Sequence, residues 1–248
     1  MTSGFGWWRS FIRRPRLMVL LSTSGLLIAL NWWLYIWAVN AGHVVETSLG
    51  YFINPLVNVL LGVVVLKERL SIMQWLAVLI AASGVLYLAL QTGVPPWIAL
   101  ALACSFSLYG LIRKIAVVEA IPALGLENAI LIGPVLLYLF WVHRAGTGAL
   151  GDQGVVTDGL LVASGLVTAV PLVLFVYGAQ RIPYSMMGIL QYIAPTLQLG
   201  CAVVLFQEPF SSAQAVGFGA IWVALAVYAT DGFLRRQRDR SQEPEGLL

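Results

Sequence analysis

Two prolines stand near the middle of long apolar stretches, each flanked by polar side chains. Pro55 lies within residues 44–66 and Pro195 within residues 184–206. A proline inside a helix removes a backbone N–H donor and frees a carbonyl group one turn earlier. Where such interrupted helices meet inside a membrane, the freed groups can line a solute cavity, whereas the simpler alternative is a kink. The shared setting of the two prolines favours interrupted helices around a cavity.

Polar residues recur at helical spacing around both prolines. The first stripe repeats every four positions and shares one helix face; it consists of Glu46, Gly50, Asn54 and Asn58. Gln191 and Gln198 are seven residues apart and also share a face. An amide in hydrocarbon is costly unless it faces protein or water, so these side chains either line a cavity or hydrogen-bond between helices. We predict that Asn54, Asn58, Gln191 and Gln198 line a substrate cavity.

One further amide and several phenol groups extend the predicted site. These side chains offer flat rings and hydroxyl groups that could hold an organic solute. The predicted substrate-binding residues are completed by Asn31, Tyr35, Tyr51, Tyr109 and Tyr192. Tryptophans near the ends of apolar stretches are assigned to the membrane interfaces, where this residue type collects.

Two carboxylates are candidates for proton coupling. Glu127 is more than one turn inside its predicted helix, where it could take up a proton during transport. It could equally reach the interface or pair with Arg113 or Lys114. Glu46, at the outer end of its helix, has the same ambiguity.

Residue types that support enzyme or metal chemistry are scattered along the chain. Cys104 and Cys201 are isolated in apolar stretches, and His43 and His143 have no clustered partners. The sequence contains no Gly-x-x-x-x-Gly-Lys-Ser/Thr phosphate loop, no Gly-x-Ser-x-Gly elbow and no His-Glu-x-x-His pair. We therefore expect no metal, no cofactor and no enzymatic activity.

Composition predicts the elements that must position these residues. With 60% hydrophobic and 10% charged residues, the 248-residue chain has too little polar surface to cover a soluble globule. About 20 apolar residues span a bilayer as a helix. We predict an all-α membrane protein, a polytopic bundle with eight transmembrane helices at residues 17–37, 44–66, 72–90, 96–112, 123–142, 158–179, 184–206 and 211–233.

The basic residues predict the orientation. Short loops force successive helices to alternate sides, which places every Lys and Arg except Arg144 on one face. By the positive-inside rule that face is cytoplasmic, so we expect both termini inside the cell, with a basic segment at residues 1–16 and a polar tail at 234–248. Topology and contact with anionic lipid explain the basic residues without a nucleic-acid partner. We expect the protein in the inner membrane, and the sequence leaves open whether it forms a homo-oligomer.

An internal repeat organises the chain. Residues 37–87 match residues 177–227 without a gap, at a spacing of 140. The repeat unit is therefore five helices long, and an odd number inserts the second copy upside down. We expect the chain to be the remnant of a ten-helix, five-plus-five inverted repeat, shortened at its N-terminus. Residues 17–90 would hold three helices of the first copy, and residues 96–233 the five of the second.

Each copy also contains a capping box before an apolar run. The boxes and the glutamates before them are Glu68, Ser71 and Gln74 in the first copy and Glu208, Ser211 and Gln214 in the second. We assign these residues to the starts of the third and eighth helices and give them no role in transport.

Several segments carry a resemblance to a known family. They are residues 31–40, Ser48–Asn58 with its Gly-Tyr-Phe-Ile-Asn-Pro core, Tyr109–Lys114 and Gln191–Thr196. These segments resemble RarD permeases of the EamA branch of the drug/metabolite transporter superfamily, and the similarity covers essentially the whole chain. The resemblance implies a ten-helix permease of the cytoplasmic membrane and no substrate that can be transferred.

The repeat, the paired prolines and the uncharged amides favour a secondary permease that moves a small organic solute or drug-like metabolite by alternating access. One alternative is a shortened, inactive membrane fragment. A membrane enzyme that acts on lipid is a weaker alternative, because Glu127 alone would have to supply its acid.

Overall fold

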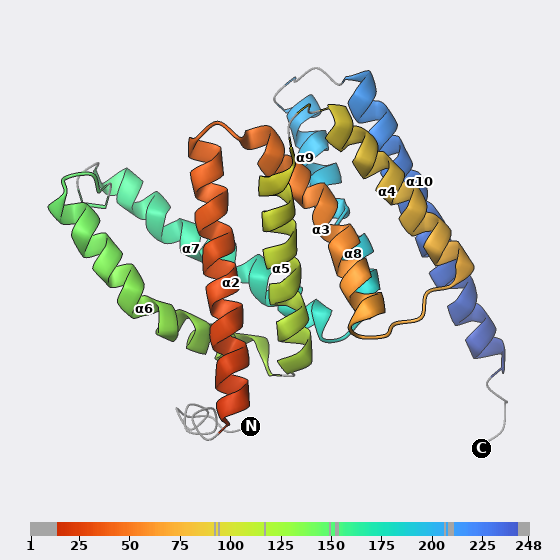
Figure 1. The fold of residues 1–248 in the computed structure, drawn as a ribbon, viewed down its shortest axis with the longest axis horizontal. Coiled ribbons are helices and arrows are strands. Elements are labelled where there is room, and N and C mark those ends of the chain that lie inside the picture. The colour runs from red at the N-terminus through yellow and green to blue at the C-terminus, as the bar shows by residue number, and fades with distance from the viewer. Residues whose placement is uncertain are drawn as a thin grey trace. The chain divides into compact units, whose positions relative to one another are not determined.

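A computed structural model describes residues 14–91, 93, 95–116, 118–148, 150–151, 154–205, 207 and 211–242. This part of the chain is helical, with no strand among the residues described (Figure 1). The helices are α2 (Pro15–Asn40), α3 (Val44–Val64), α4 (Ile72–Gln91), α5 (Trp97–Ala116), α6 (Ala120–Arg144), α7 (Val155–Ala179), α8 (Tyr184–Leu190), α9 (Ile193–Val204) and α10 (Ser212–Gln242). The all-α prediction is confirmed for these residues. Most of the predicted basic segment, Glu208 and the end of the predicted tail lie outside them.

Within the described residues, seven helices are long and apolar enough to cross a membrane, namely α2 to α7 and α10. The remaining predicted span, residues 184–206 and seventh in chain order, is not one helix, because α8 and α9 are separated at Gln191 and Tyr192. The sequence counted this stretch as one span and favoured an interruption near Pro195, and in the structure two helices lie there. Pro195 has no N–H to offer the Gln191 carbonyl and its ring crowds that group, which accepts from the Ala194 N–H at 3.2 Å instead. Pro195 itself lies in the first turn of α9, where a missing N–H costs nothing.

The chain divides into two compact units. The first contains the described residues up to Trp32 together with Leu108–Ile182, and the second contains Trp33–Ser107 with the described residues from Pro183 onward. Residues of α2 and α5 therefore belong to both units. The domain boundaries expected from the repeat stay a prediction.

In the second unit, α4 and α10 are repeat-related helices that pack side by side and antiparallel (Figure 1). Just before α4, the Ser71 hydroxyl donates to Asp231 of α10 at 2.8 Å, whereas the other end of α4 brings Leu88 against Gly217. Small residues allow this approach, since a Cβ placed on Gly84 would lie 2.9 Å from the Gly217 carbonyl oxygen.

The helices α3 and α8 form a second repeat-related pair in the same unit, also antiparallel. A Cβ placed on Gly188 of α8 would lie 2.6 Å from the Pro55 carbonyl oxygen and 2.9 Å from Asn58 Cβ. About one turn further along, the Tyr192 hydroxyl donates to the Phe52 carbonyl at 3.1 Å. A glycine at position 188 is therefore needed for the two backbones to touch.

Local geometry follows the repeat through both hairpins. Lys67 and Gln207, which are 140 residues apart, both have a φ of 55°, and they are the non-glycine residues with positive φ in the described part of the chain. Both capping boxes form: the Ser71 N–H donates to Gln74 Oε1 at 2.9 Å and the Ser211 N–H donates to Gln214 Oε1 at 2.8 Å. The predicted helix starts are confirmed.

In the first unit, two helix ends satisfy each other's carbonyl groups. Lys114, near the end of α5, donates to the carbonyl oxygens of Ala179 and Ile182 at 2.8 and 2.6 Å, at the end of α7. Gln180 in turn donates to the Val118 carbonyl at 2.7 Å, just beyond α5. A cation suits a helix C-terminus, where the unpaired carbonyls carry partial negative charge.

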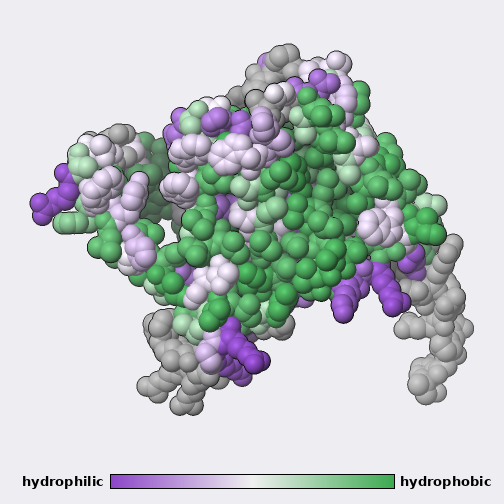
Figure 2. Space-filling view, in the orientation of Figure 1, coloured by the Kyte–Doolittle hydropathy of each residue, from purple (hydrophilic) through white to green (hydrophobic). Residues whose placement is uncertain are grey.

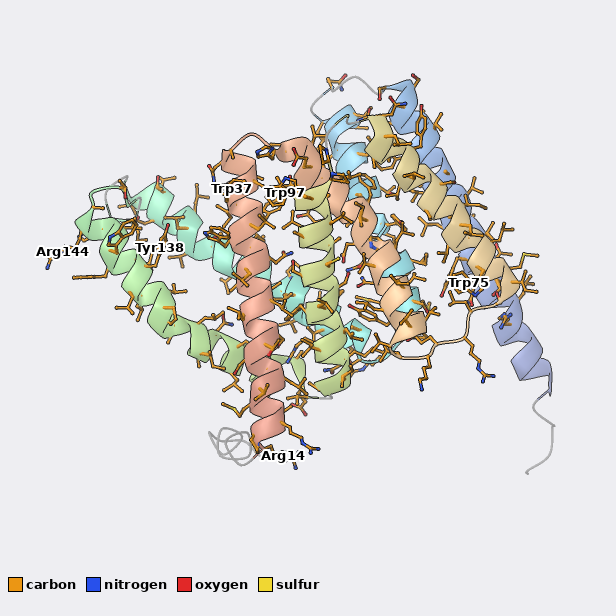
Figure 3. The ribbon with its side chains drawn as sticks, in the orientation of Figure 1. Arg14, Trp37, Trp75, Trp97, Tyr138 and Arg144 are labelled. Carbon is orange, nitrogen blue, oxygen red and sulfur yellow. The ribbon has the colours of Figure 1, made fainter. Side chains whose placement is uncertain are left out.

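Apolar side chains cover the outer faces of the helices, as a lipid environment requires (Figure 2). In α7, only 6% of the most apolar 18-residue stretch is buried inside the protein. Aromatic residues lie near helix ends (Figure 3), where Trp75 is in the first turn of α4 and the rings of Trp37 and Trp97 are 6.2 Å apart. These positions fit membrane interfaces.

Candidate functional site

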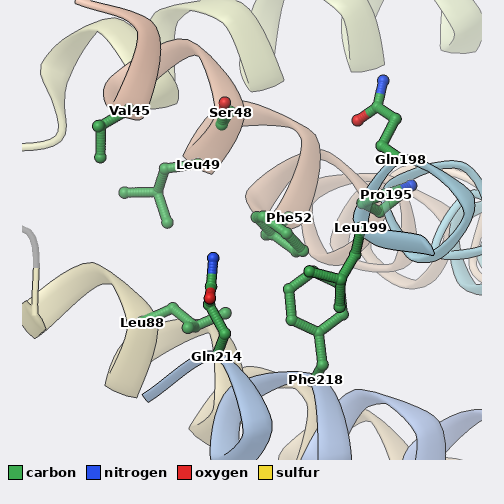
Figure 4. Close-up of a pocket in the computed structure, with 10 residues that line it drawn as sticks. All are labelled: Val45, Ser48, Leu49, Phe52, Leu88, Pro195, Gln198, Leu199, Gln214 and Phe218. Carbon is green, nitrogen blue, oxygen red and sulfur yellow. The ribbon is translucent and has the colours of Figure 1, made fainter. Parts of the chain in front are cut away.

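The second unit contains a cavity of about 290 Å³ (Figure 4). Its lining consists of Val45, Ser48, Leu49, Phe52, Leu88, Pro195, Gln198, Leu199, Gln214 and Phe218. Seven of these ten side chains are apolar, three are polar and none is charged. Such a surface suits a small, uncharged and partly apolar molecule.

The cavity lies toward one end of the second unit. Its α3 residues come from the first nine positions of that helix, Leu88 comes from the last turn of α4, and Gln214 and Phe218 come from the first two turns of α10. The hairpin that contains Lys67 joins the opposite ends of α3 and α4. The cavity and that hairpin are therefore at opposite ends of the unit.

At the hairpin end, Glu68 links the hairpin to α8. Its carboxylate accepts the backbone N–H groups of Tyr184 and Ser185 at 2.6 and 2.8 Å, which caps the N-terminus of α8. A carboxylate at a helix N-terminus satisfies unpaired donors and interacts favourably with the helix dipole. Sequence analysis assigned Glu68 only to the start of the following helix, whereas it ties that hairpin to a helix 116 residues further along the chain.

Two of the predicted site residues, Gln198 and Pro195, line the cavity. Three others meet at the helix break instead. Asn58 Nδ2 donates to Gln191 Oε1, and Asn54 Nδ2 donates to the same oxygen at 3.4 Å. Ser107 completes the group by donating to Asn54 Oδ1 at 2.6 Å. With Asn58 at 0% exposure, this amide cluster joins α3 to the break between α8 and α9. Its role in binding stays a prediction.

The predicted aromatic residues are dispersed. Tyr192 is buried and bonded to α3, whereas Tyr35 and Tyr51 meet edge to face with ring centroids 6.1 Å apart. Tyr109 is buried within α5, and Asn31 is half-buried on α2. None of these five is among the residues that line the cavity of about 290 Å³.

A buried ion pair occupies the first unit. Arg113 Nη1 and Glu127 Oε1 are 3.6 Å apart, and the two side chains are 0% and 2% exposed. Ser24 of α2 donates to the same carboxylate, and Gly25 lets α2 approach, because a Cβ there would lie 3.3 Å from Glu127 Cβ. Glu127 therefore pairs with Arg113, one of the partners that the sequence left open, while Lys114 is engaged with α7.

Several polar atoms of this ion pair make no hydrogen bond to the described residues. Arg113 Nε and Nη1 and Glu127 Oε2 have no hydrogen-bond partner among the described residues. Burying an ionisable pair between two membrane helices costs free energy, so the pair is a candidate for function. Glu46 differs, because its carboxylate lies 2.9 Å from His43 Nδ1 at the start of α3.

Comparisons with known proteins agree with this membrane architecture. The EamA-like transporter family matches residues 1–90 and 95–230. The chain belongs to the EamA-like transporter family. An uncharacterized transporter of Pseudomonas aeruginosa is 47% identical over 233 residues, which cover 94% of this chain and 78% of that protein. RarD of Streptomyces exfoliatus is 44% identical over 238 residues (96% and 76%), and RarD of Escherichia coli is 42% identical over 230 residues (93% and 78%).

These relatives make the chain a RarD-type member of the EamA-like family, and the predicted resemblance is confirmed. A solved crystal structure shares the fold at a TM-score of 0.60 and 21% identity, covering 86% of this chain and 88% of its own. The EamA-family chain is thus a multi-pass membrane protein with the fold and the relatives of a transporter.

Several cavity residues of this EamA-family chain were missed by sequence reasoning. Ser48 and Phe52 lie four residues apart on α3, beside the polar stripe rather than on it. Gln214 was assigned to a capping box alone, and Phe218, one turn later on α10, was not singled out. The apolar residues spaced along the first two turns of α3 were a possible signal for this cavity wall. Their spacing is also that of an ordinary lipid-facing stripe.

Proposed function

We propose that the chain is a secondary permease that moves a small, uncharged or amphipathic organic solute across the cytoplasmic membrane by alternating access. The cavity carries this proposal. Five of its lining residues come from the first repeat copy and five from the second, and none is charged. A site between two repeat copies is where secondary transporters bind their substrates.

The proposed mechanism rests on an inverted relation between the copies. The repeat-related helices α4 and α10 pack antiparallel, as do α3 and α8, which is the arrangement that an inverted repeat produces. In this proposal the Glu68 end is cytoplasmic and closed, and the cavity lies toward the outer side. Rocking of one copy against the other would reverse this state.

A solute screen in proteoliposomes tests transport, with and without a pH gradient. The matched variants are Ser48→Trp, which fills the cavity, and Ser83→Trp, which adds the same side chain to an exposed position of α4. We expect uptake of at least one solute by the wild type and by Ser83→Trp, and its loss in Ser48→Trp. If no solute moves although the protein is folded, or if the two variants behave alike, the proposal fails.

Orientation is tested by single cysteines in a background lacking Cys104 and Cys201. Arg69→Cys and Gln207→Cys place thiols in the two repeat-related hairpins. A membrane-impermeant thiol reagent applied to intact cells should label only position 207, because the inverted repeat puts the two hairpins on opposite sides. Labelling of both positions, or of position 69 alone, would contradict the inverted topology.

For coupling, we propose that Glu127 carries a proton when its pairing with Arg113 is released. Glu127→Gln should abolish the effect of a pH gradient on uptake while exchange of labelled for unlabelled solute continues. Glu119→Gln is the control, because that carboxylate makes no capping hydrogen bond at the start of the same helix. Persistence of the gradient effect in Glu127→Gln would assign the ion pair a purely structural role.

A further inference from the structure

The capping box at the start of α10 fixes the orientation of one amide in the cavity wall. Gln214 Oε1 accepts the backbone N–H of Ser211 at 2.8 Å and its hydroxyl at 3.1 Å, and the Gln214 N–H donates back to the Ser211 hydroxyl at 3.2 Å. The side-chain oxygen and the backbone N–H of Gln214 are thus both bonded to Ser211. The carboxamide cannot exchange its oxygen and nitrogen without losing the cap.

This orientation leaves the amide nitrogen for the cavity. Figure 4 shows the nitrogen of Gln214 directed toward the space beside Leu49 and Phe52, with the oxygen nearer its own helix. A carboxamide NH₂ group is a donor only. The other two polar side chains differ, since the Ser48 hydroxyl donates a hydrogen bond to the Val44 carbonyl at 2.8 Å and Gln198 lies on the exposed side of α9.

The walls around this donor are apolar and aromatic. The rings of Phe52 and Phe218 meet edge to face at 89°, with centroids 5.1 Å apart, and both line the cavity. None of the ten described lining residues is charged, so this part of the wall offers no charged partner to an ion. A ligand that fits must bring an apolar body for the rings and an acceptor for the Gln214 amide.

We propose that Gln214 is the specificity-determining donor of the cavity and selects uncharged solutes that carry a carbonyl or similar acceptor next to an aromatic or apolar group. This inference rests on the proposed function, because it identifies the substrate class of the same cavity. Gln214 is half-buried, and a partly desolvated donor left without an acceptor disfavours analogues that lack one, which is how a single polar group sets specificity.

The repeat supplies a matched control. Gln74 makes the same capping box, with the Ser71 N–H donating to its Oε1 at 2.9 Å and its own N–H donating to Ser71 at 3.0 Å. That box lies at the other end of the helix pair, where the Ser71 hydroxyl donates to Asp231. Gln74 is not among the cavity residues. Equal changes at positions 74 and 214 therefore disturb the two capping bonds that the boxes share but only one cavity.

The experiment measures binding of two near-isosteric probes to the purified protein in detergent, by titration of the thermal unfolding midpoint. Phenylacetamide carries a carbonyl acceptor, and 2-phenylethylammonium has a methylene group in its place and a positive charge. We expect wild type and Gln74→Glu to bind phenylacetamide alike and Gln214→Glu to bind it about tenfold more weakly, as for one lost hydrogen bond. Glu keeps an oxygen for the cap and removes the donor, so Gln214→Glu should also bind 2-phenylethylammonium more tightly than wild type does.

A second pair of variants guards against a folding defect. Gln214→Met and Gln74→Met lose the same cap, so their unfolding midpoints should fall together, whereas only Gln214→Met should lose phenylacetamide binding. Equal affinities in the two Met variants, or failure of the wild type to bind phenylacetamide, would overturn the inference. Neither readout requires transport: binding that follows Gln214 in a protein that moves no solute would refute the permease and leave the donor assignment standing.

Discussion

The segments around Pro55 and Pro195 descend from one repeated sequence, yet they fold differently. The helix α3 runs unbroken through Pro55 from Val44 to Val64, whereas the second copy breaks at Gln191 and Tyr192, one turn before Pro195. A proline is therefore insufficient to interrupt a helix. In the second copy the residues at the break have partners on α3, since Gln191 accepts from two asparagines and the Tyr192 hydroxyl donates to a carbonyl. The interruption forms where side chains at the break hydrogen-bond a neighbouring helix.

The largest expected effect comes from the contact that brings these two segments together. Gly188→Ala should lower the free energy of unfolding by about 2–3 kcal/mol, because its Cβ would meet the backbone of α3 at position 55. Thermal unfolding in detergent measures this. Gly200→Ala is the control: nothing lies within 4 Å of a Cβ there, so it should be neutral or stabilising. Equal destabilisation by both would mean that the close contact between α3 and α8 is absent.

The next effect separates the amide cluster from the cavity. Asn58→Leu should cost about 1–2 kcal/mol of stability, since it removes a buried donor to Gln191 and leaves that oxygen with only its longer bond to Asn54. Gln198→Leu should change stability by less than about 0.5 kcal/mol, because its side chain is exposed, and should instead reduce solute uptake. Unfolding and uptake are measured on the same preparations. The reverse pattern would place the binding site at the helix break.

A smaller effect is expected at the cap that holds the start of α8. Glu68→Gln keeps one acceptor oxygen but loses the charge and one of two hydrogen bonds, so we expect a loss of about 1 kcal/mol in unfolding experiments. Glu119→Gln, at a helix start where no side-chain cap forms, should show no such loss. If the two variants are equally stable, the carboxylate does not hold α8.

The smallest effects concern a feature that the copies share. Lys67→Gly and Gln207→Gly should each stabilise the protein by about 0.5 kcal/mol, because glycine adopts the positive φ of 55° without steric cost. The larger conformational entropy that glycine loses on folding offsets part of this gain. The unfolding midpoints should rise by similar amounts. A gain at one position and a loss at the other would show that the two hairpins are not equivalent.

Much of the fold could be predicted because it depends on residues near one another in sequence. The helix α4, expected at residues 72–90, is Ile72–Gln91, and both capping boxes form at their predicted serines. The length of an apolar run and the bonds of a cap are decided within a few residues. Gln198 and Pro195, which the repeat singled out, line the cavity, and their role in binding stays a prediction.

The sequence by itself determined the membrane class, the positions of the long helices, the repeat and the family. Tertiary structure decided which helix breaks, which partner Glu127 takes, and that Glu68 and Gln214 act beyond their own hairpins. Except for the Arg113–Glu127 pair, those outcomes depend on groups brought together from more than 100 residues away, such as the 133 residues between Asn58 and Gln191. A hydrogen bond or close contact between distant helices leaves no periodic trace in the sequence, because its free energy depends on packing that only the folded chain creates.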